Sequence, residues 1–216
     1  MLHYIYGEDL DAYPLLRDSM FLDRAEQFHH RLGWQVGLTP KGFEQDKYDG
    51  MNPLYLIWEV DGRHAASMRF LPTVGPTMVN DHFSHLTDGV RIESPLIWEC
   101  TRFCLALDAD RRGAPAIVLG AGEIMEKFHL EHYVGVFDPR MERIYRLLKV
   151  QPDVIGSAGT GRDRVGVGLW SFDASARGPI CARVGVTPET SREWFRRAFT
   201  QRVPQRAQPE LQLMAA

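Results

Sequence analysis

Residues 54–71 have the sequence LYLIWEVDGRHAASMRFL. Two mainly apolar runs, at 54–60 and 64–71, flank the pair Asp61-Gly62. Asp-Gly is one of the strongest short signals for a two-residue hairpin turn, because both residues tolerate the positive φ that such a turn requires. The segment therefore predicts two antiparallel neighbouring strands, and a sheet at the centre of the fold.

Helical and strand-like patterns alternate around this hairpin. Apolar spacing predicts helices within 10–31, 115–132 and 187–200, and Asp138-Pro139 supplies an N-cap and a first-turn proline for another helix, ending near 150. Further strands are expected at 96–107, 133–137, 154–158 and 165–172. This order predicts a single α/β domain over 1–203, an α/β/α sandwich around a mixed twisted sheet, followed by a flexible tail at 204–216.

Composition excludes several classes of protein. The 216 residues contain 25 Lys and Arg against 28 Asp and Glu, a formal charge of −3, whereas a dedicated nucleic-acid binder is usually basic. We find no apolar run long enough to cross a bilayer and no signal-peptide pattern at the N-terminus. Three cysteines cannot close a disulfide framework. We expect a reduced cytoplasmic protein, not inserted in a membrane and without a nucleic-acid partner.

The sequence contains no complete short motif for nucleotide binding or for a catalytic nucleophile. Gly120 and Gly122 start a dinucleotide-like pattern, but its third small residue is replaced by Met125, and the pair lies inside a helical pattern. There is no phosphate-binding G-x-x-x-x-G-K-[ST] sequence and no G-x-S-x-G nucleophile elbow.

Metal motifs are equally weak. The histidine pairs at 82/85 and 129/132 lack a third ligand at a recognised spacing. Strand alternation puts Cys100 and Cys104 on one face, too far apart to bind one metal ion, so we interpret them as core thiols. No metal site is predicted.

Charged residues occur where a buried strand would not place them. Arg69 lies in the apolar run 65–71, and Glu99 and Arg102 lie in 96–107. Charges in such strands are costly unless they are paired or face a cleft. Two interpretations stay open from these residues alone: a partly buried salt-bridge network with a structural role, or a functional site.

The wider pattern favours the second interpretation. Its elements are Arg24-x3-Phe28-x5-Trp34, Glu44-x-Asp46-x-Tyr48-Asp49, Arg69 and Glu99-x-x-Arg102. This pattern resembles that of the acyl-homoserine-lactone synthases, the LuxI-type autoinducer synthases. The resemblance covers about the first 105 residues well and 115–150 more loosely; beyond 150 only length and the approximate strand pattern agree.

The resemblance implies a fold similar to that of the GNAT acetyltransferases, and a reaction. In this family the amine of S-adenosylmethionine attacks an acyl thioester, carried by acyl carrier protein or coenzyme A. The methionine carboxylate then closes a lactone and releases methylthioadenosine. The product is an N-acyl-L-homoserine lactone, a quorum-sensing signal. No metal and no tightly bound cofactor is implied, because S-adenosylmethionine is a substrate.

The resemblance also suggests roles for the charged and aromatic residues. The candidate catalytic residues are Arg24, Asp46, Asp49, Arg69, Glu99 and Arg102. An α-amine is largely protonated at neutral pH, so a carboxylate must accept a proton; Glu99 is the first choice, and Asp46 or Asp49 could share the task. Phe28 and Trp34, with the acidic groups, suit the sulfonium cation, and the arginines suit a carboxylate. By analogy, the backbone of Arg102 and Phe103 also holds S-adenosylmethionine.

Two further regions concern the acyl donor. Gly135 stands where the family has a threonine when 3-oxo acyl chains are used, so we expect a different acyl group, in a pocket that includes Gly135 and Met141. Acyl carrier protein is acidic, and the helix after Asp138 carries a stripe of basic residues that could dock it: Arg140, Arg143, Arg146 and Lys149. An ordinary solvated helix face explains this stripe equally well. Arg192, Arg196 and Arg197 form a second candidate surface.

Two alternatives belong to other classes. A GNAT-like N-acyltransferase would use acyl-coenzyme A on another amine, although residues 111–114 do not match the phosphate-binding loop of that family. A non-catalytic acyl-binding module would share the fold but would have little use for Asp46, Asp49 and Glu99 among arginines.

Overall fold

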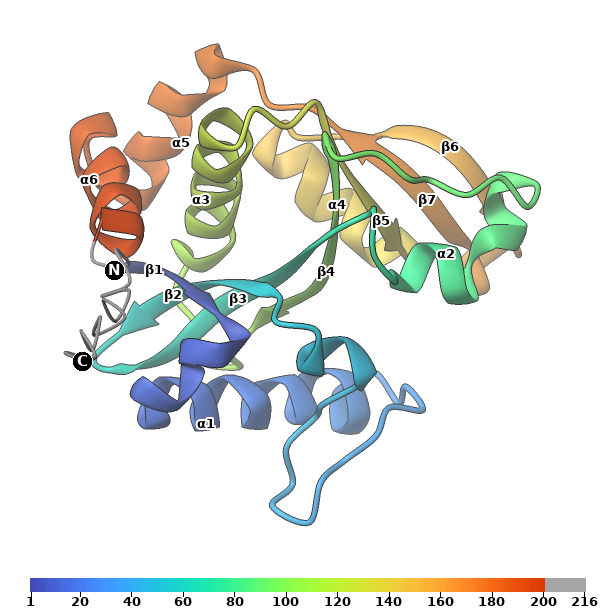
Figure 1. Ribbon diagram of the computed structural model, residues 1–216, viewed down its shortest axis with the longest axis horizontal. Helices are drawn as coiled ribbons and strands as arrows, with labels where there is room; N and C mark the ends of the chain where they lie inside the picture. The colour runs from blue at the N-terminus through green and yellow to red at the C-terminus, as the bar shows by residue number, and fades with distance from the viewer. Residues whose placement is uncertain (201–216) are drawn as a thin grey trace, which may run out of the picture.

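A seven-stranded mixed sheet organises the computed structural model, which describes residues 1–200 (Figure 1). The spatial order is β1-β2-β3-β4-β5-β7-β6. The strands are β1 (Leu2–Tyr6), β2 (Leu54–Val60), β3 (Arg63–Pro72), β4 (Ile97–Leu105), β5 (His132–Phe137), β6 (Asp153–Ala158) and β7 (Val165–Trp170). All neighbouring strands are antiparallel except β4 and β5, which are parallel.

Helices cover both faces of this sheet, so the predicted fold class is confirmed (Figure 1). The α-helices are α1 (Pro14–Arg24), α2 (Met78–His82), α3 (Gly113–Lys127), α4 (Pro139–Leu148), α5 (Arg177–Val184) and α6 (Pro188–Thr200). A π-helical turn, η2 (Ala25–Arg31), continues α1, and short 3-10 turns are η1 (Gly7–Ala12), η3 (Lys47–Gly50), η4 (Ser84–Thr87), η5 (Gly161–Asp163) and η6 (Ala174–Ala176).

Strand β2 is buried on both faces. Leu54 and Leu56 pack into the core cluster with α3, whereas Tyr55 and Ile57 pack into a second cluster with α1. This explains why the strand is almost continuously apolar rather than alternating with polar residues. The hairpin is confirmed: Asp61 and Gly62 both have positive φ, at 51° and 78°.

Other expectations hold in part. Helix α4 begins at Pro139 with Asp138 as its cap, as predicted. The region 10–31 forms one α-helix with a π-helical continuation, and the predicted helix 115–132 occupies Gly113–Lys127 instead. Strand β1 and helices α2 and α5 were not predicted. The proposed tail at 204–216 lies outside the described residues, and no helix within 1–200 is long and apolar enough to cross a membrane.

A β-bulge in β4 positions Arg102, one of the predicted catalytic residues. The pairing with β3 passes from Arg69↔Thr101 to Ser67↔Cys104, so β4 has an extra residue there. Arg102 takes a left-handed conformation, with φ of 55°, in this bulge. A bulge reverses which face the following residues occupy.

The bulge overturns the prediction that Cys100 and Cys104 share a face. Cys100 packs on the α3 side of the sheet, whereas Cys104 is buried near the charges of Asp23 and Arg24 on α1. All three cysteines are free, and the described residues contain no group of three or more side chains placed to bind a metal ion.

Candidate active site

Three arginines and three carboxylates from distant parts of the chain form one buried cluster. Arg24 ends α1, Arg69 lies on β3 and Arg102 lies in the β4 bulge. The loop between η2 and β2 supplies Glu44, Asp46 and Asp49. The structure thus brings together five of the six predicted catalytic residues, the exception being Glu99.

Arg24 joins α1 to the acidic loop. Its Nε donates to Oε2 of Glu44 at 2.6 Å, and its two Nη atoms donate to the two carboxylate oxygens of Asp49 at 2.9 and 3.0 Å. Both Arg24 and Glu44 are almost inaccessible to solvent. A charge-assisted, two-point pair in such surroundings fixes orientation as well as position.

Arg69 holds the same loop from the sheet. Its Nη1 donates to Asp46 at 2.6 Å and Asp49 at 2.9 Å, and its Nε donates to the hydroxyl of Thr101 at 3.1 Å. Burial works to raise the pKa of Asp49, but Arg24 and Arg69 hold that pKa well below its ordinary value. Asp49 is therefore a permanent carboxylate, not a proton acceptor at neutral pH.

The loop sequence itself orients the two aspartates. Asp46 caps η3: its Oδ1 accepts the amides of Tyr48 and Asp49 at 2.9 and 3.3 Å, while Oδ2 of Asp49 accepts the amide of Asp46 at 2.8 Å. This reciprocal capping box leaves the remaining lone pairs facing the arginines. The Tyr55 hydroxyl, which sequence reasoning missed, donates to Asp49 at 2.6 Å. Strand alternation places Tyr55 on the face of β2 that packs against α1, and this could have indicated its contact with the cluster.

Arg102 connects the cluster to an aromatic pair. Its guanidinium bonds Glu44 at 3.1 Å and Asp46 at 2.7 Å, and lies 5.6 Å from the centre of the Phe28 ring. Phe28 stacks on Trp34 with ring centres 5.2 Å apart and planes 5° from parallel. Trp34 is exposed, so this pair presents an aromatic face beside the buried charges. Glu44 was part of the sequence pattern but had no assigned role; here it joins two arginines.

Glu99 is bound differently from the other carboxylates. Its two oxygens accept the backbone amides of Met78 at 3.0 Å and Val79 at 2.6 Å, at the N-terminus of α2. Burial raises the pKa of Glu99 despite these hydrogen bonds. No ion pair joins it to an arginine in the described part of the chain. Glu99 is thus an acidic side chain whose pKa is shifted towards that of a general base.

An apolar cavity of about 80 Å³ lies between the sheet, α3 and α4. It is lined by residues from β3, β4 and β5, from both helices and the chain just after α4, and from the end of β7 and the chain that follows it: Met68, Cys100, Phe103, Val118, Ala121, Gly122, Met125, Tyr133, Ile144, Tyr145, Leu148, Val150, Trp170, Ser171 and Phe172. Phe103 adjoins Arg102, so the cavity begins next to the charged cluster. Neither Gly135 nor Met141 is among its lining residues; Gly135 lies behind the wall, against Cys100 and Trp170.

Helix α4 and its C-terminal end expose the whole predicted basic stripe. Arg140, Arg143, Arg146 and Lys149 are all exposed, and Arg140 is also paired with its cap Asp138 at 2.5 Å. Leu147 projects among them with 61% of its surface exposed. On α6 the second candidate surface is largely neutralised: Arg192 pairs with Glu189, and Arg196 and Arg197 pair with Glu193.

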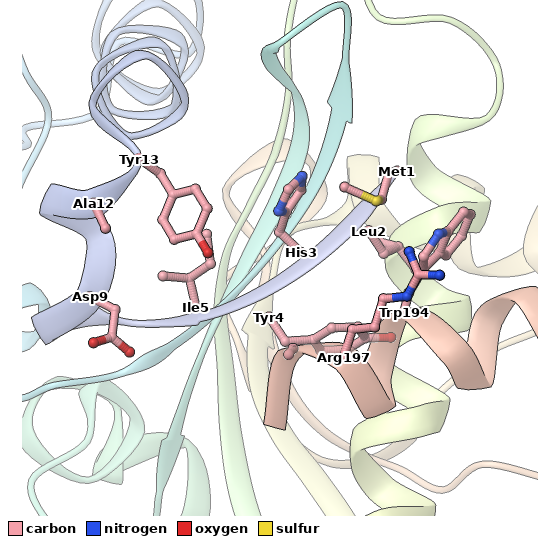
Figure 2. Close-up of a pocket in the computed structure, with 11 residues that line it drawn as sticks. Met1, Leu2, His3, Tyr4, Ile5, Asp9, Ala12, Tyr13, Trp194 and Arg197 are labelled. Atoms are coloured by element: carbon pink, nitrogen blue, oxygen red, sulfur yellow. The ribbon is translucent and has the colours of Figure 1, made fainter. Parts of the chain in front are cut away.

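A second and larger hollow of about 490 Å³ lies beside β1, the strand at one edge of the sheet (Figure 2). Asp9, Ala12 and Tyr13 lie on one side of β1 in this view, and Trp194 and Arg197 of α6 lie on the other. Among the described residues, Arg197 of the second candidate surface lines this hollow, and none of the candidate catalytic, S-adenosylmethionine-binding or acyl-pocket residues does.

The chain is similar in sequence to known autoinducer synthases. The family model described as autoinducer synthase matches residues 12–163. An acyl-homoserine-lactone synthase of Rhizobium etli is 36% identical over 182 residues, covering 81% of this chain and 85% of the relative. A synthase of the same name from Ralstonia nicotianae is 30% identical over 174 residues, covering 76% and 83%.

Solved structures show a similar fold. The coenzyme A-dependent acyl-homoserine lactone synthase BjaI, solved with S-adenosylmethionine and isopentyl-coenzyme A, superposes with a TM-score of 0.76 at 21% identity, over 86% of this chain and 90% of that one. An acyl-coenzyme A N-acyltransferase from Pseudomonas aeruginosa superposes with a TM-score of 0.50 at 14% identity, over 80% and 99%. The sheet and its helices are therefore of the GNAT-like type.

Proposed function

This chain belongs to the autoinducer synthase family, the acyl-homoserine-lactone synthases, and from that premise we propose how its own residues carry out the reaction. The enzyme forms an N-acyl-homoserine lactone from S-adenosylmethionine and an acyl thioester. The observation that carries the assignment of the site is the buried cluster of Arg24, Arg69 and Arg102 with three carboxylates, next to the Phe28–Trp34 stack.

The charges of this site suit S-adenosylmethionine. Three arginines balance Glu44, Asp46 and Asp49, so the cluster is neutral and Glu99 adds one negative charge. S-adenosylmethionine carries a sulfonium, an ammonium and a carboxylate, a net charge of +1. We assign the sulfonium to the Phe28–Trp34 stack through cation–π attraction. The substrate carboxylate belongs near the guanidinium of Arg102, which has the most exposed side chain of the three arginines.

Glu99 is the proposed proton acceptor. The substrate ammonium must lose a proton before its lone pair can attack the thioester carbonyl. A carboxylate with a raised pKa accepts that proton, directly or through one water molecule, more readily than Asp46 or Asp49, which are neutralised by arginines. The attack forms the amide and expels the donor thiolate, which takes up a proton. The substrate carboxylate then attacks the carbon next to the sulfonium, closes the lactone and releases methylthioadenosine.

The acyl donor is held on the other side of β4. The apolar cavity beside Phe103 suits an acyl chain, and pairing of β4 with β5 ends at Glu99 and Val134, so the two strands are not hydrogen-bonded beyond this point. We propose acyl carrier protein as the carrier, docked on the exposed basic residues Arg143, Arg146 and Lys149 of α4 around Leu147. Acyl-coenzyme A is the alternative, favoured by the similarity in fold to BjaI. The three free thiols are typical of a cytoplasmic location.

The test is a reconstituted reaction. Purified protein is incubated with S-adenosylmethionine and acyl thioesters of both carriers, and mass spectrometry follows methylthioadenosine and the lactone. We expect both products in equal amounts. A general N-acyltransferase would acylate other amines without releasing methylthioadenosine, and a binding module would release nothing; either result contradicts the proposal. The preferred carrier is the one with the higher kcat/KM.

A further inference from the structure

Two glycines, one that lines the acyl cavity and one behind its wall, are each covered by an aromatic side chain from the same short segment. Gly135 on β5 lies against Trp170, the last residue of β7. Gly122 on α3 lies against Phe172, two residues later. Both aromatic rings line the cavity. The wall there is formed by large aromatic side chains, each packed closely against a glycine where a larger residue would clash.

The Phe172 ring packs very closely against Gly122. A Cβ atom on Gly122 would lie 2.5 Å from both Cε2 and Cζ of the Phe172 ring, well inside van der Waals contact. Glycine inside a helix costs about 1 kcal/mol relative to alanine, and the close approach of this ring gives a physical reason for its presence. On the outer side, the guanidinium of Arg177 lies 5.8 Å from the ring centre and is paired with Glu126 and Glu123. The ring is therefore held from both sides.

Trp170 is fixed equally firmly. Its Nε1 donates to the carbonyl of Val150 at 3.0 Å, and its ring makes edge contacts with Tyr145 and Phe137 at 5.2 and 5.8 Å. A Cβ on Gly135 would lie 3.2 Å from this ring and 3.0 Å from the sulfur of Cys100. Gly135 therefore adds no free space to the cavity, because Trp170 and Cys100 occupy the space beside it.

The two rings lie at the end of the cavity away from the charged cluster. Trp170 pairs with Tyr133, in the part of β5 that is still hydrogen-bonded to β4, whereas Phe103 lies past the last β4–β5 pair, next to Arg102. An acyl chain whose carbonyl is near Arg102 and Phe103 would extend towards Trp170 and Phe172.

We propose that Trp170 and Phe172 determine the maximum length of the acyl chain by closing the far end of the cavity. The inference rests on the proposed function and adds the class of substrate: acyl thioesters short enough to end before these rings. A close-packed wall on rigid supports rejects one methylene too many by about 10–200-fold in kcat/KM. A mobile wall would discriminate much less.

Truncation of Phe172 tests this inference. We expect Phe172→Ala to move the maximum of kcat/KM to chains at least two carbons longer than that of the wild type, with a gain of ten-fold or more for the longer donor. Phe172→Leu, which fills part of the space and disturbs folding less, should give a smaller shift in the same direction. The measurement is lactone formation from a series of straight-chain acyl thioesters that differ by two carbons.

Phe199→Ala is the matched control. Phe199 is also half-buried against the same hydrophobic core but does not line the cavity, so its loss should leave the order of chain lengths unchanged. If Phe172→Ala and Phe172→Leu make lactone with the chain-length order of the wild type, the inference is wrong while the proposed function stands. If the wild type releases no methylthioadenosine with any donor, the proposed function fails, and this inference with it.

Discussion

Arg24 and Asp49 are 25 residues apart in the chain and form a two-point ion pair, with both Nη atoms of the arginine bonded to both oxygens of the aspartate at 2.9 and 3.0 Å. The pair ties the end of α1 to the loop that precedes β2. Because Arg69 bonds the same carboxylate from β3, Asp49 is the junction of the helix, the loop and the sheet. The geometry of the active site and the stability of the fold are therefore coupled at this residue.

Replacement of Asp49 by asparagine should cost about 3–5 kcal/mol in the free energy of unfolding, since it leaves two buried guanidinium groups with one fewer charge partner. The contribution of the ionised Asp49 is fully present above its unfolded pKa of about 4 and is lost as pH falls towards its depressed native value. Urea unfolding at pH 7 and pH 3 measures both effects. Asp18→Asn, at a more exposed salt bridge, should change stability by less than about 0.5 kcal/mol.

The candidate residues of the site could be predicted because their pattern along the chain resembles that of the acyl-homoserine-lactone synthases, and part of their geometry is local. Asp46 and Asp49 are three residues apart, which suits a capping box, and Arg69 is a charge in an apolar strand that needs a partner. The hairpin at Asp61-Gly62 was equally local. Neighbouring residues determine the capping box and the hairpin, whereas the charge of Arg69 indicates only that a partner is needed.

The remaining features depend on distant parts of the chain. Nothing near Arg102 in the sequence indicates a left-handed residue inside a strand; the bulge exists because β3 and β4 pair out of register around it. The partner of Glu99 is the backbone of α2, a five-residue helix without a side-chain cap and with little amphipathic pattern. Strand β1 is too short to be distinguished from a loop without β2 beside it.

Glu99→Gln should lower kcat by about 10²–10⁴-fold with little loss of stability, because a glutamine oxygen can still accept an amide of α2 but cannot accept the substrate proton. In the wild type the base is the ionised form. Since burial raises the pKa of Glu99, the rate should fall as pH is lowered while still above the ordinary glutamate value of 4.5. Initial rates of methylthioadenosine release between pH 5 and 8 check this. Exposed Glu131→Gln is the control, and an active Glu99→Gln enzyme would remove Glu99 from the mechanism.

Charge reversal on α4 separates the two acyl carriers. The double variant Arg143→Glu and Arg146→Glu should raise KM for acyl carrier protein thioesters at least ten-fold, because the docking attraction becomes repulsion, and the effect should weaken with added salt. KM for the matching acyl-coenzyme A should change much less. Arg192→Glu on α6 serves as control. Equal effects of the double variant on both carriers would argue against a docking role for α4.

His64 should make the fold sensitive to mild acid. Its ring is buried between Asp23 at 2.7 Å and Ser67 at 2.9 Å, and burial lowers its pKa although Asp23 opposes this and Arg24 assists it. The unfolded chain therefore binds a proton below about pH 6.5 that the native state resists, so stability falls as pH drops below that value, by at most about 1.4 kcal/mol per pH unit. Melting temperatures from pH 7.5 to 5.5 should fall more steeply for the wild type than for His64→Asn, whose amide can still donate to Asp23. Parallel curves would contradict this.

Gly156 and Gly178 should respond in opposite directions to the same substitution. Strand β6 passes so close to η4 that a Cβ on Gly156 would lie 1.7 Å from the carbonyl oxygen of Leu86 and 2.8 Å from its carbonyl carbon. Both are backbone atoms, so no side-chain rotation can relieve the clash. Gly156→Ala must therefore separate β6 from η4, and we expect a loss of at least about 2 kcal/mol. A Cβ on Gly178 in α5 meets nothing within 4 Å, so Gly178→Ala should be neutral or stabilise by up to about 1 kcal/mol through helix propensity. Urea unfolding followed by circular dichroism measures both, and similar midpoints for the two variants would show that β6 can move away from η4 at little cost.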